Sequence, residues 1–132
     1  MELVIFACRQ NAGRSQMAKA FFTLLADPSR ACAISAGTRP AERVHPEVEM
    51  VMQEVGVELA GVQPQRLTRG LAAGACLLVT MGCGEECPFV PGVAVEDWAL
   101  PDPHDQPLAR VREIRDTIRA QVADLIARRG WR

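Results

Sequence analysis

The sequence predicts an α/β fold, a three-layer sandwich in which a four-stranded parallel sheet is flanked by helices. The first observation is that short, continuous apolar runs alternate with segments of helical periodicity. The second is that these runs are bounded by turn residues, which is typical of strands buried on both faces of a parallel sheet. Strands that alternate with helices imply a parallel sheet with helices on both sides. At 132 residues, we expect a single domain over residues 1–132.

Two strand–helix units are predicted in the first half of the chain. Residues 3–7 form the first apolar run, and from Ser15 to Leu25 the apolar residues recur at helical spacing. Residues 31–36 are the second predicted strand. Proline is favoured at the first position of a helix, so we expect Pro46 to begin the second helix and Gly56 to end it.

The second half of the chain predicts two more strands and a long final helix. A short helical turn is expected over residues 66–71, followed by strands at 76–80 and 93–98. The helix over residues 108–126 has one apolar stripe. Most of its arginines lie off that stripe, and we interpret them as a solvated face: Arg110, Arg112, Arg115, Arg119, Arg128 and Arg129.

Charge and hydropathy exclude several classes of partner. Fifteen basic and sixteen acidic side chains give a net charge of −1, so no basic field exists to attract nucleic acid or anionic lipid. No apolar stretch reaches the roughly 18 residues of a membrane span, and the N-terminus has no secretory signal. We therefore expect a cytoplasmic monomer without nucleic acid or membrane partners.

Five cysteines and the lack of tyrosine are the unusual features of the composition. An odd number of cysteines argues against a disulfide framework and indicates thiols that are free, metal-bound or chemically active. Cys32 and Cys76 lie within apolar strands, so we expect both to be inert core thiols.

The loop after the first strand has the composition of an anion-binding site. Parallel sheets bind ligands beyond the carboxyl ends of their strands, and the backbone N–H groups of such a loop can surround an oxyanion at the start of a helix. Arg14 can hold two oxygens of that anion, above the thiol of Cys8. The candidate oxyanion-binding residues are Arg9, Gln10, Asn11, Ala12, Gly13, Arg14 and Ser15.

Two residues of this loop have further expected roles. Ser15 is expected either to cap the helix or to donate a hydrogen bond to the Cys8 thiolate. Asn11 tolerates a left-handed conformation and can brace the loop from inside. The alternative interpretation is a buried core cysteine in front of a helix with a surface arginine.

Cys83 and Cys87 follow the third predicted strand, and the residues alone leave three interpretations open. They are loop thiols, half of a zinc site, or a redox pair. Zinc is disfavoured because the other possible ligands include no second close pair: Cys8, Cys32, Cys76, His45 and His104. If the segment is helical, the two Cβ atoms lie about 5–6 Å apart. A disulfide needs about 3.5–4.5 Å, so oxidation would require a local rearrangement.

Asp102 stands between two prolines beyond the fourth predicted strand. A carboxylic acid in this place can protonate a departing oxygen, although an aspartate before a proline is equally typical of a turn. His45, which precedes Pro46, is interpreted as a loop or cap residue rather than a catalyst.

Residues 8–18, CRQNAGRSQMA, resemble the phosphate-binding loop of the low-molecular-weight protein tyrosine phosphatase superfamily. The continuation from Arg14 to Ala18 is most similar to the arsenate reductase branch. Further matches follow in the same order along nearly the whole chain: residues 35–37, 79–84, 87–88, 96–98, 102–103 and 111–116. The resemblance implies that Cys8 is the nucleophile, Arg14 the oxyanion ligand, Asp102 the general acid, and Cys83 and Cys87 the redox pair.

The reaction that this resemblance implies is the reduction of arsenate to arsenite, as in arsenic detoxification. Cys83 would resolve Cys8, and Cys87 would then resolve Cys83, leaving a Cys83–Cys87 disulfide for thioredoxin to reduce. Phosphate and sulfate would compete with arsenate, and we expect no cofactor or metal besides the redox-active disulfide. Gly13 departs from the resemblance, since many relatives have a further cysteine at that position.

Three alternatives remain. The first is a protein tyrosine phosphatase that forms a phosphocysteine at Cys8, with arsenate reduction replaced by hydrolysis. Few aromatic residues are available to hold a phosphotyrosine ring, which disfavours this activity as the main one. The second is an arsenate reductase that uses mycothiol or glutaredoxin as electron donor. The third is a non-enzymatic sensor of oxyanions or metals.

Overall fold

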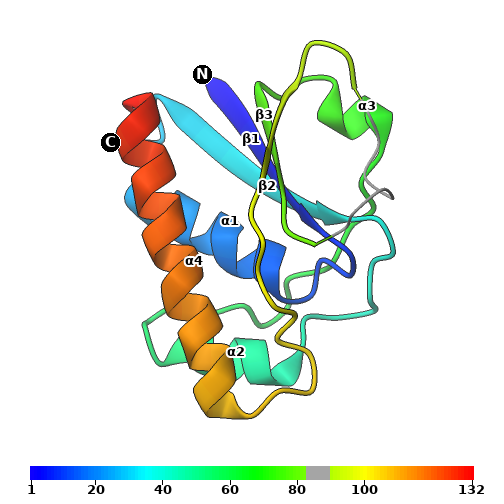
Figure 1. Cartoon of the computed structure of the whole chain (residues 1–132), viewed down its shortest axis with the longest axis vertical. Coiled ribbons are helices and arrows are strands. Elements are labelled where there is room, and N and C mark those ends of the chain that lie inside the picture. Colours follow the sequence, from blue (N-terminus) through cyan, green and yellow to red (C-terminus); the bar gives the residue numbers. More distant parts are fainter. Residues whose placement is uncertain (83–89) are drawn as a thin grey trace.

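A computed structural model describes residues 1–82 and 90–132 of the chain (Figure 1). Strands and helices alternate in the predicted order. The elements are β1 (Glu2–Cys8), α1 (Arg14–Leu25), β2 (Ala31–Gly37), α2 (Pro46–Gln53), α3 (Arg69–Ala72), β3 (Leu77–Thr80), β4 (Ala94–Asp97) and α4 (Leu108–Arg129).

The four strands form one parallel sheet in the order β2-β1-β3-β4. In the register of this sheet, Cys8 lies beside Gly37, Ala7 beside Thr80, and Thr80 beside Asp97. Because the strands are parallel, the loops that follow them all leave from the same end of the sheet, where the carboxyl ends of the strands lie.

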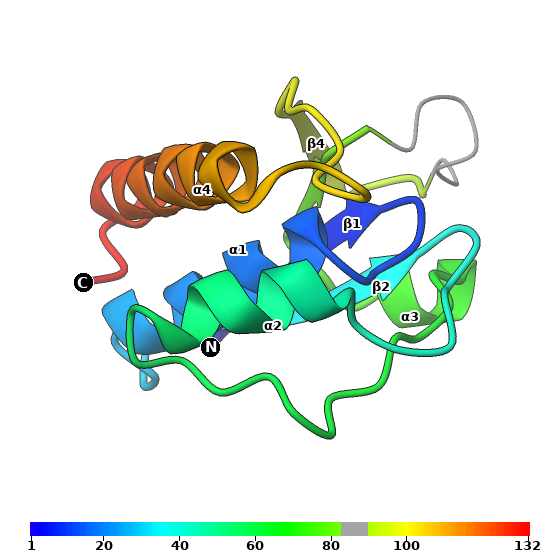
Figure 2. The same cartoon turned by 90° about the horizontal axis from the view of Figure 1, so that it is seen from below.

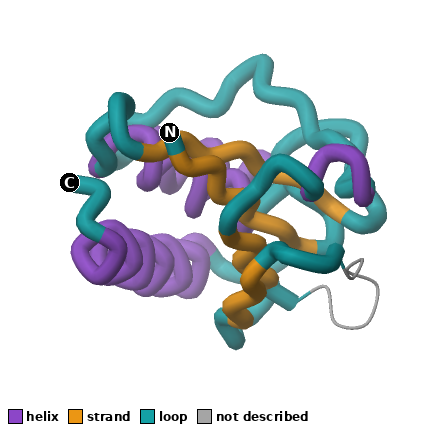
Figure 3. Tube along the Cα trace, turned by 90° about the horizontal axis from the view of Figure 1, so that it is seen from above, coloured by secondary structure: helices purple, strands orange, loops and turns teal. Residues whose placement is uncertain are grey.

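Helices cover both faces of the sheet, which confirms the predicted fold class. Helices α1, α2 and α4 lie on one face, and the short α3 lies on the other (Figures 2 and 3). Both covering layers bury strand β1 because its side chains alternate between the two faces. Val4 and Phe6 belong to the larger core with α1, α2 and α4, whereas Ile5 and Ala7 belong to a smaller core with the segment around α3. This double burial explains the continuous apolar run at the start of the sequence.

Aromatic side chains connect the helical layer to the sheet in the larger core. The ring of Phe6 lies 5.9 Å from that of Phe22 in α1 and 5.8 Å from that of Trp98 after β4. Phe22 in turn lies 5.8 Å from Trp131, beyond the end of α4. These packed rings fix α1, and with it the loop that precedes α1, against the sheet.

The observed boundaries differ from the predicted ones by a few residues. Helix α2 ends at Gln53, and residues 54–56 form a turn before the predicted stop at Gly56. Helix α3 is shorter than the predicted turn, and α4 continues three residues past the predicted end. Among residues 1–82 and 90–132, no helix combines the length and the hydropathy of a membrane span.

The prediction that Cys32 is a core thiol was wrong. Cys32 is exposed on β2, between the buried Ala31 and Ala33. The smaller core includes Ala36 and, at its margin, Ile34, but it does not extend to Cys32. The reason is that the layer on this face is built around a four-residue helix, which is too short to cover the start of an edge strand.

Cys76, just before β3, is half-buried rather than fully buried. Burial and the neighbouring Glu2 carboxylate raise the pKa of the Cys76 thiol to about 11. This side chain is therefore a neutral thiol at pH 7, as an unreactive cysteine should be.

The interpretation of Arg115 as a solvated residue was also wrong. Its side chain is buried between α4 and α2, where it donates hydrogen bonds of 2.9 Å to the Val51 carbonyl and to Glu54. Helix α2 packs over this position, and periodicity within α4 alone cannot show which neighbour covers its edge.

Candidate active site

The loop between β1 and α1 is almost completely buried, although it is rich in polar groups. Cys8 is 2% exposed, and Asn11, Ala12 and Ser15 are fully buried. Arg9 is exposed and Gln10 is half-buried. Buried polar groups need internal hydrogen-bond partners, and the side chain of Asn11 makes three such bonds.

Asn11 has a φ of +51° and braces the loop from inside, as expected from the sequence. Its Oδ1 atom accepts hydrogen bonds from the Gln65 backbone N–H (2.9 Å) and from Gln16 Nε2 (3.2 Å). Its Nδ2 atom donates to Ser15 Oγ at 2.8 Å. One side chain thus connects the loop, the first turns of α1 and the segment after α2.

Ser15 directs its hydroxyl at the Cys8 thiol. The Ser15 Oγ to Cys8 Sγ distance is 2.9 Å. Since Oγ accepts from the Asn11 amide, the hydroxyl proton is available for the sulfur. Of the two expected roles for Ser15, the structure therefore contains the hydrogen bond to the thiol. In the described part of the chain, no side chain caps the start of α1.

Arg14, the first residue of α1, joins three strand ends. Its side chain starts beside the Cys8 loop, and its NH1 atom donates to the Leu100 carbonyl at 3.0 Å, beyond β4. Gly82, beyond β3, has a φ of +95°, and a Cβ atom built there would lie 2.3 Å from Arg14 NH1. Glycine at position 82 has no Cβ atom and tolerates the positive φ, so it leaves room for the Arg14 guanidinium.

The Arg14 guanidinium is buried and only partly used by the protein. The residue is 7% exposed, and its Nε atom has no hydrogen-bond partner among residues 1–82 and 90–132. A buried, permanently charged donor without a protein partner is costly. Such a donor is well suited to an anion held by the loop.

Asp102 makes a turn contact with one carboxyl oxygen and faces Arg14 with the other. Its Oδ1 atom accepts a hydrogen bond from the His104 backbone N–H (2.9 Å), which is a turn contact. Its Oδ2 atom lies 3.8 Å from Arg14 NH2. The carboxyl is half-exposed and faces the guanidinium, within reach of an anion bound there.

His45 and His104 form part of this neighbourhood, which sequence reasoning missed. The His45 backbone N–H donates to the Ala12 carbonyl at 2.9 Å, and the two imidazole rings are stacked with centroids 4.3 Å apart. Burial, and then the charge of His104, lower the pKa of His45. The His45–Pro46 pair indicated a helix start, and only the fold reveals the ring stack.

Gly13 is where the cysteine loop and the Asp102 loop meet. A Cβ atom at position 13 would lie 2.9 Å from Pro103 Cγ and 3.5 Å from His45 Cδ2. A larger residue here would push on the segment that carries Asp102. This contact gives a physical reason for glycine at the position where the sequence departs from the family pattern.

Cys83 and Cys87 lie outside the described residues. Gly82 is the last described residue before them, and it contacts Arg14.

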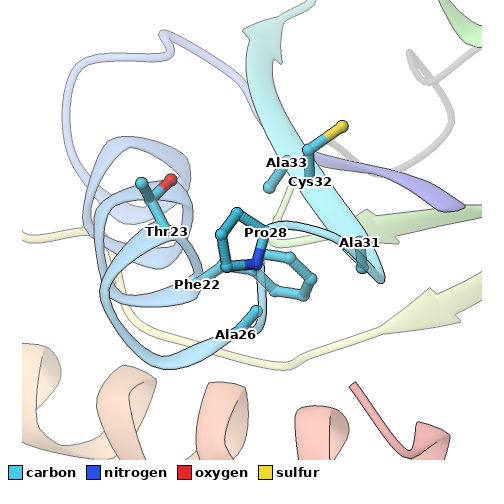
Figure 4. Close-up of a pocket in the computed structure, with 7 residues that line it drawn as sticks. All are labelled: Phe22, Thr23, Ala26, Pro28, Ala31, Cys32 and Ala33. Atoms are coloured by element: carbon cyan, nitrogen blue, oxygen red, sulfur yellow. The ribbon is translucent and has the colours of Figure 1, made fainter. Parts of the chain in front are cut away.

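A small pocket lies beside the start of β2 and has Cys32 among its lining residues, although the Cys32 sulfur points away from the other lining side chains (Figure 4). Its other lining residues are Phe22, Thr23, Ala26, Pro28, Ala31 and Ala33, and its volume is about 90 Å³. These residues surround the start of β2, whereas Cys8 lies beside the end of that strand. The pocket is therefore separate from the Cys8 loop.

Comparisons with known proteins agree with this arrangement. The model of the low molecular weight phosphotyrosine protein phosphatase family matches residues 3–129. The chain is 40% identical over 126 residues to a putative arsenate reductase of Halobacterium salinarum, covering 91% of this chain and 87% of that protein. It is 32% identical over 131 residues to a glutaredoxin arsenate reductase of a Synechocystis species, covering 97% of this chain and 98% of that protein.

Among solved structures, a thioredoxin-dependent arsenate reductase of Corynebacterium glutamicum superposes with a TM-score of 0.81 at 35% identity. The match covers 95% of this chain but 60% of that longer protein. The similarity in fold therefore extends over nearly all of the present sequence.

Proposed function

This chain belongs to the low molecular weight phosphotyrosine protein phosphatase family, and we propose that it acts within that family as an arsenate reductase. The observation that carries the proposal is the buried Cys8 thiol, hydrogen-bonded to Ser15 in a loop that ends at a buried arginine. The 40% identity to a putative arsenate reductase supports this activity.

Arsenate binds in the loop over residues 9–15. Backbone N–H groups and the positive end of α1 attract the oxyanion. The Arg14 guanidinium, with its buried and unpaired Nε atom, binds the arsenate oxygens. Phosphate and sulfate have the same tetrahedral shape and compete for this loop.

In the first step, the Cys8 thiolate attacks arsenic. A sulfur–arsenic bond forms, and one arsenic–oxygen bond breaks. Asp102 donates a proton to the departing hydroxide, which leaves as water. Arsenic is still pentavalent after this step, because no electrons have yet been transferred to it.

The second step is the reduction. The Cys83 thiolate attacks the Cys8 sulfur, so that a disulfide forms and the sulfur–arsenic bond breaks with its electron pair remaining on arsenic. Trivalent arsenite leaves. Cys87 then attacks Cys83, which releases the Cys8 thiolate and leaves a Cys83–Cys87 disulfide. Two electrons from an external dithiol restore the enzyme.

We assign thioredoxin as that dithiol. One similar protein is a thioredoxin-dependent arsenate reductase and another is a glutaredoxin arsenate reductase. An NADPH-coupled assay with arsenate should offer thioredoxin, glutaredoxin and mycothiol separately, each with its own reductase. Turnover with thioredoxin alone is expected. Turnover with glutaredoxin or mycothiol alone would contradict the assigned donor but not arsenate reduction itself.

Replacement of Cys87 tests the relay. A Cys87→Ser variant should complete one reduction and then stop with Cys8 bonded to Cys83, because no thiol remains to release Cys8. Peptide mass spectrometry after one arsenate turnover detects this disulfide. Cys32→Ser is the matched control, since that thiol is exposed at the far end of β2, and it should turn over normally. Full thioredoxin-driven turnover by Cys87→Ser would contradict the relay.

Phosphatase activity uses the same loop, with Cys8 forming a phosphocysteine that water hydrolyses. The five aromatic side chains in the described part of the chain are all buried in the core, which leaves none of them to hold a phosphotyrosine ring: Phe6, Phe21, Phe22, Trp98 and Trp131. We therefore expect a larger kcat/KM for arsenate than for an aryl phosphate. The reverse order would assign the chain to phosphate ester hydrolysis.

A further inference from the structure

We propose that His45, Glu47 and His104 form a binding site for a divalent transition-metal ion such as Zn²⁺ or Co²⁺, at the junction between the cysteine loop and the Asp102 loop. His45 and Glu47 lie at the start of α2, and His104 lies in the segment between β4 and α4. That segment runs past the start of α2 in Figure 1. The reaction derived above does not require this ion.

The three side chains already lie close enough to share one ion. One ligand atom from each residue lies within 4.8 Å of the other two. In a tetrahedral zinc site with bonds of about 2.0–2.1 Å, ligand atoms are about 3.4 Å apart. The His104 side chain is 45% exposed, so its ring has room to rotate toward the other two ligands.

The His45 ring is a second, independent indication of a ligand. The residue is only 8% exposed. Neither ring nitrogen makes a hydrogen bond with any residue in the described ranges, and the ring instead stacks on His104 at 4.3 Å. The ring nitrogens are therefore available to bind an ion. The His45 imidazole faces the His104 imidazole and the Glu47 carboxylate, an arrangement typical of ligands around a metal ion.

The charges around the cluster favour a cation. The carboxylate of Glu47 lies 3.9 Å from His104 Nδ1, and that of Asp105 lies 3.2 Å from His104 Nε2. The Asp105 backbone N–H donates to Glu47 Oε1 at 3.3 Å, which holds the Glu47 carboxylate beside the segment that carries His104. The nearby cation, Arg14, is directed toward Asp102 instead.

The ligand types select the class of ion. Two imidazole nitrogens and one carboxylate oxygen suit zinc, cobalt or nickel, whereas magnesium and calcium prefer oxygen ligands alone. Three protein ligands leave at least one coordination position for water. The ion would therefore be exchangeable rather than a permanent structural part.

Binding would connect the two loops that the reaction uses. The His45 backbone N–H donates a hydrogen bond to the Ala12 carbonyl of the cysteine loop, and the His104 backbone N–H donates one to the Asp102 carboxyl. An ion shared by both rings would restrict Asp102 and slow arsenate turnover. This consequence rests on the proposed function, whereas binding of the ion does not, so a binding assay separates the two.

Cobalt titration tests the site without measuring activity. The full chain with Cys8, Cys32, Cys83 and Cys87 replaced by serine lacks the active-site thiols and the exposed Cys32 thiol that would compete for cobalt. Visible absorption then follows Co²⁺ binding, because four-coordinate cobalt absorbs far more strongly than the aquo ion. One ion per chain is expected. In this background, His104→Ala and Glu47→Gln should each weaken binding at least tenfold, since each removes one of three ligands.

Glu49→Gln is the matched control. It is the other acidic residue in the first turn of α2 and lies outside the cluster, so the cobalt affinity should stay within twofold. Thermal unfolding gives a second readout, because an ion that binds the native state raises the midpoint temperature. That rise should occur in the parent and in Glu49→Gln and be lost in His104→Ala. Equal cobalt affinity in the parent and in His104→Ala would overturn the proposal.

Discussion

The Ser15 hydroxyl lies between the Asn11 amide and the Cys8 sulfur, so its proton can be donated to that sulfur as Cys8 attacks an electrophile. A hydrogen bond to a charged group contributes about 1.5–3 kcal/mol. Ser15→Ala should therefore slow alkylation of Cys8 by iodoacetamide about tenfold at pH 7. Peptide mass spectrometry measures the Cys8 rate separately from those of the other thiols.

Ser29→Ala is the control for this prediction, because Ser29 bonds only to Asp27 in the part of the chain that the structure describes and lies far from the loop. Its Cys8 alkylation rate should match that of the natural sequence. Equal rates in Ser15→Ala and Ser29→Ala would contradict a role for Ser15 in activating the thiol.

Gly82 is the residue whose replacement should separate anion binding from folding. Gly82→Ala places a Cβ atom 2.3 Å from Arg14 NH1 and keeps an unfavourable φ of +95°. The guanidinium must move, so phosphate affinity, measured by isothermal titration calorimetry, should fall at least tenfold.

Gly92→Ala is the matched control. Gly92 has a φ of +84°, similar to that of Gly82, but a Cβ atom there meets nothing within 4 Å. Both variants should lose about 1–3 kcal/mol of stability from backbone strain. Only Gly82→Ala should lose phosphate affinity, and a similar loss in both would show that strain, rather than contact with Arg14, is responsible.

Helices α2 and α4 are joined by one carboxylate that accepts from two arginines. Glu54, at the end of α2, lies 2.7 Å from Arg112 NH2 and 2.9 Å from Arg115 NH1. The hydrogen bond from Arg112, assisted by that from Arg115, lowers the pKa of Glu54 from 4.5 to about 2. Helix α2 begins at His45 and Pro46, so this contact anchors the element that borders the cysteine loop.

The low pKa of Glu54 predicts a pH dependence of stability. The native state binds fewer protons than the unfolded state between about pH 2 and 4.5, so stability from this group is complete above pH 4.5 and is lost toward pH 2. Glu54→Gln should lower the urea midpoint at pH 7, and the difference from the natural sequence should shrink below pH 4.5. Urea unfolding at pH 7, 4 and 2.5 measures it.

Glu42→Gln is the control for the helix contact. The exposed Glu42 side chain makes no hydrogen bond or ion pair with residues 1–82 or 90–132, so its urea midpoints should follow those of the natural sequence. A constant midpoint difference for Glu54→Gln at all three pH values would contradict the assigned ion pairs.

The whole sheet brings Asp102 to the cysteine loop, since β1 and β4 are separated by β3 and their following loops still meet at Arg14. Asp102→Asn keeps the size of the side chain and removes the acid. Arsenate turnover should fall about 10²–10⁴-fold, while phosphate affinity is retained or increased because a negative charge near the anion is lost. Steady-state kinetics and calorimetry measure the two effects.

Arg14 also donates a hydrogen bond to the backbone carbonyl of Leu100, in the same loop as Asp102. Leu100→Ala leaves that carbonyl in place and serves as the control, with turnover close to that of the natural sequence. Loss of phosphate affinity in Asp102→Asn would instead assign Asp102 to holding Arg14 in position.

The fold class, the order of the elements and the anion-binding composition of the loop from Cys8 to Ser15 could all be predicted from the residues. Burial of β1 on both faces requires a continuous apolar run, and amphipathic helices require apolar residues at helical spacing. Both patterns can be recognised in the sequence without a structure. The identity of Asn11 likewise predicted its left-handed brace.

Contacts between side chains of different helices, strands and loops became visible only in the tertiary structure. Cys32 is exposed because the short α3 leaves the start of β2 uncovered, and Arg115 is buried because α2 packs over it. The contact of Gly82 with Arg14 and the stack of His45 on His104 join residues 68 and 59 positions apart. Periodicity and spacing report the environment along one element, whereas such contacts depend on how the elements pack together.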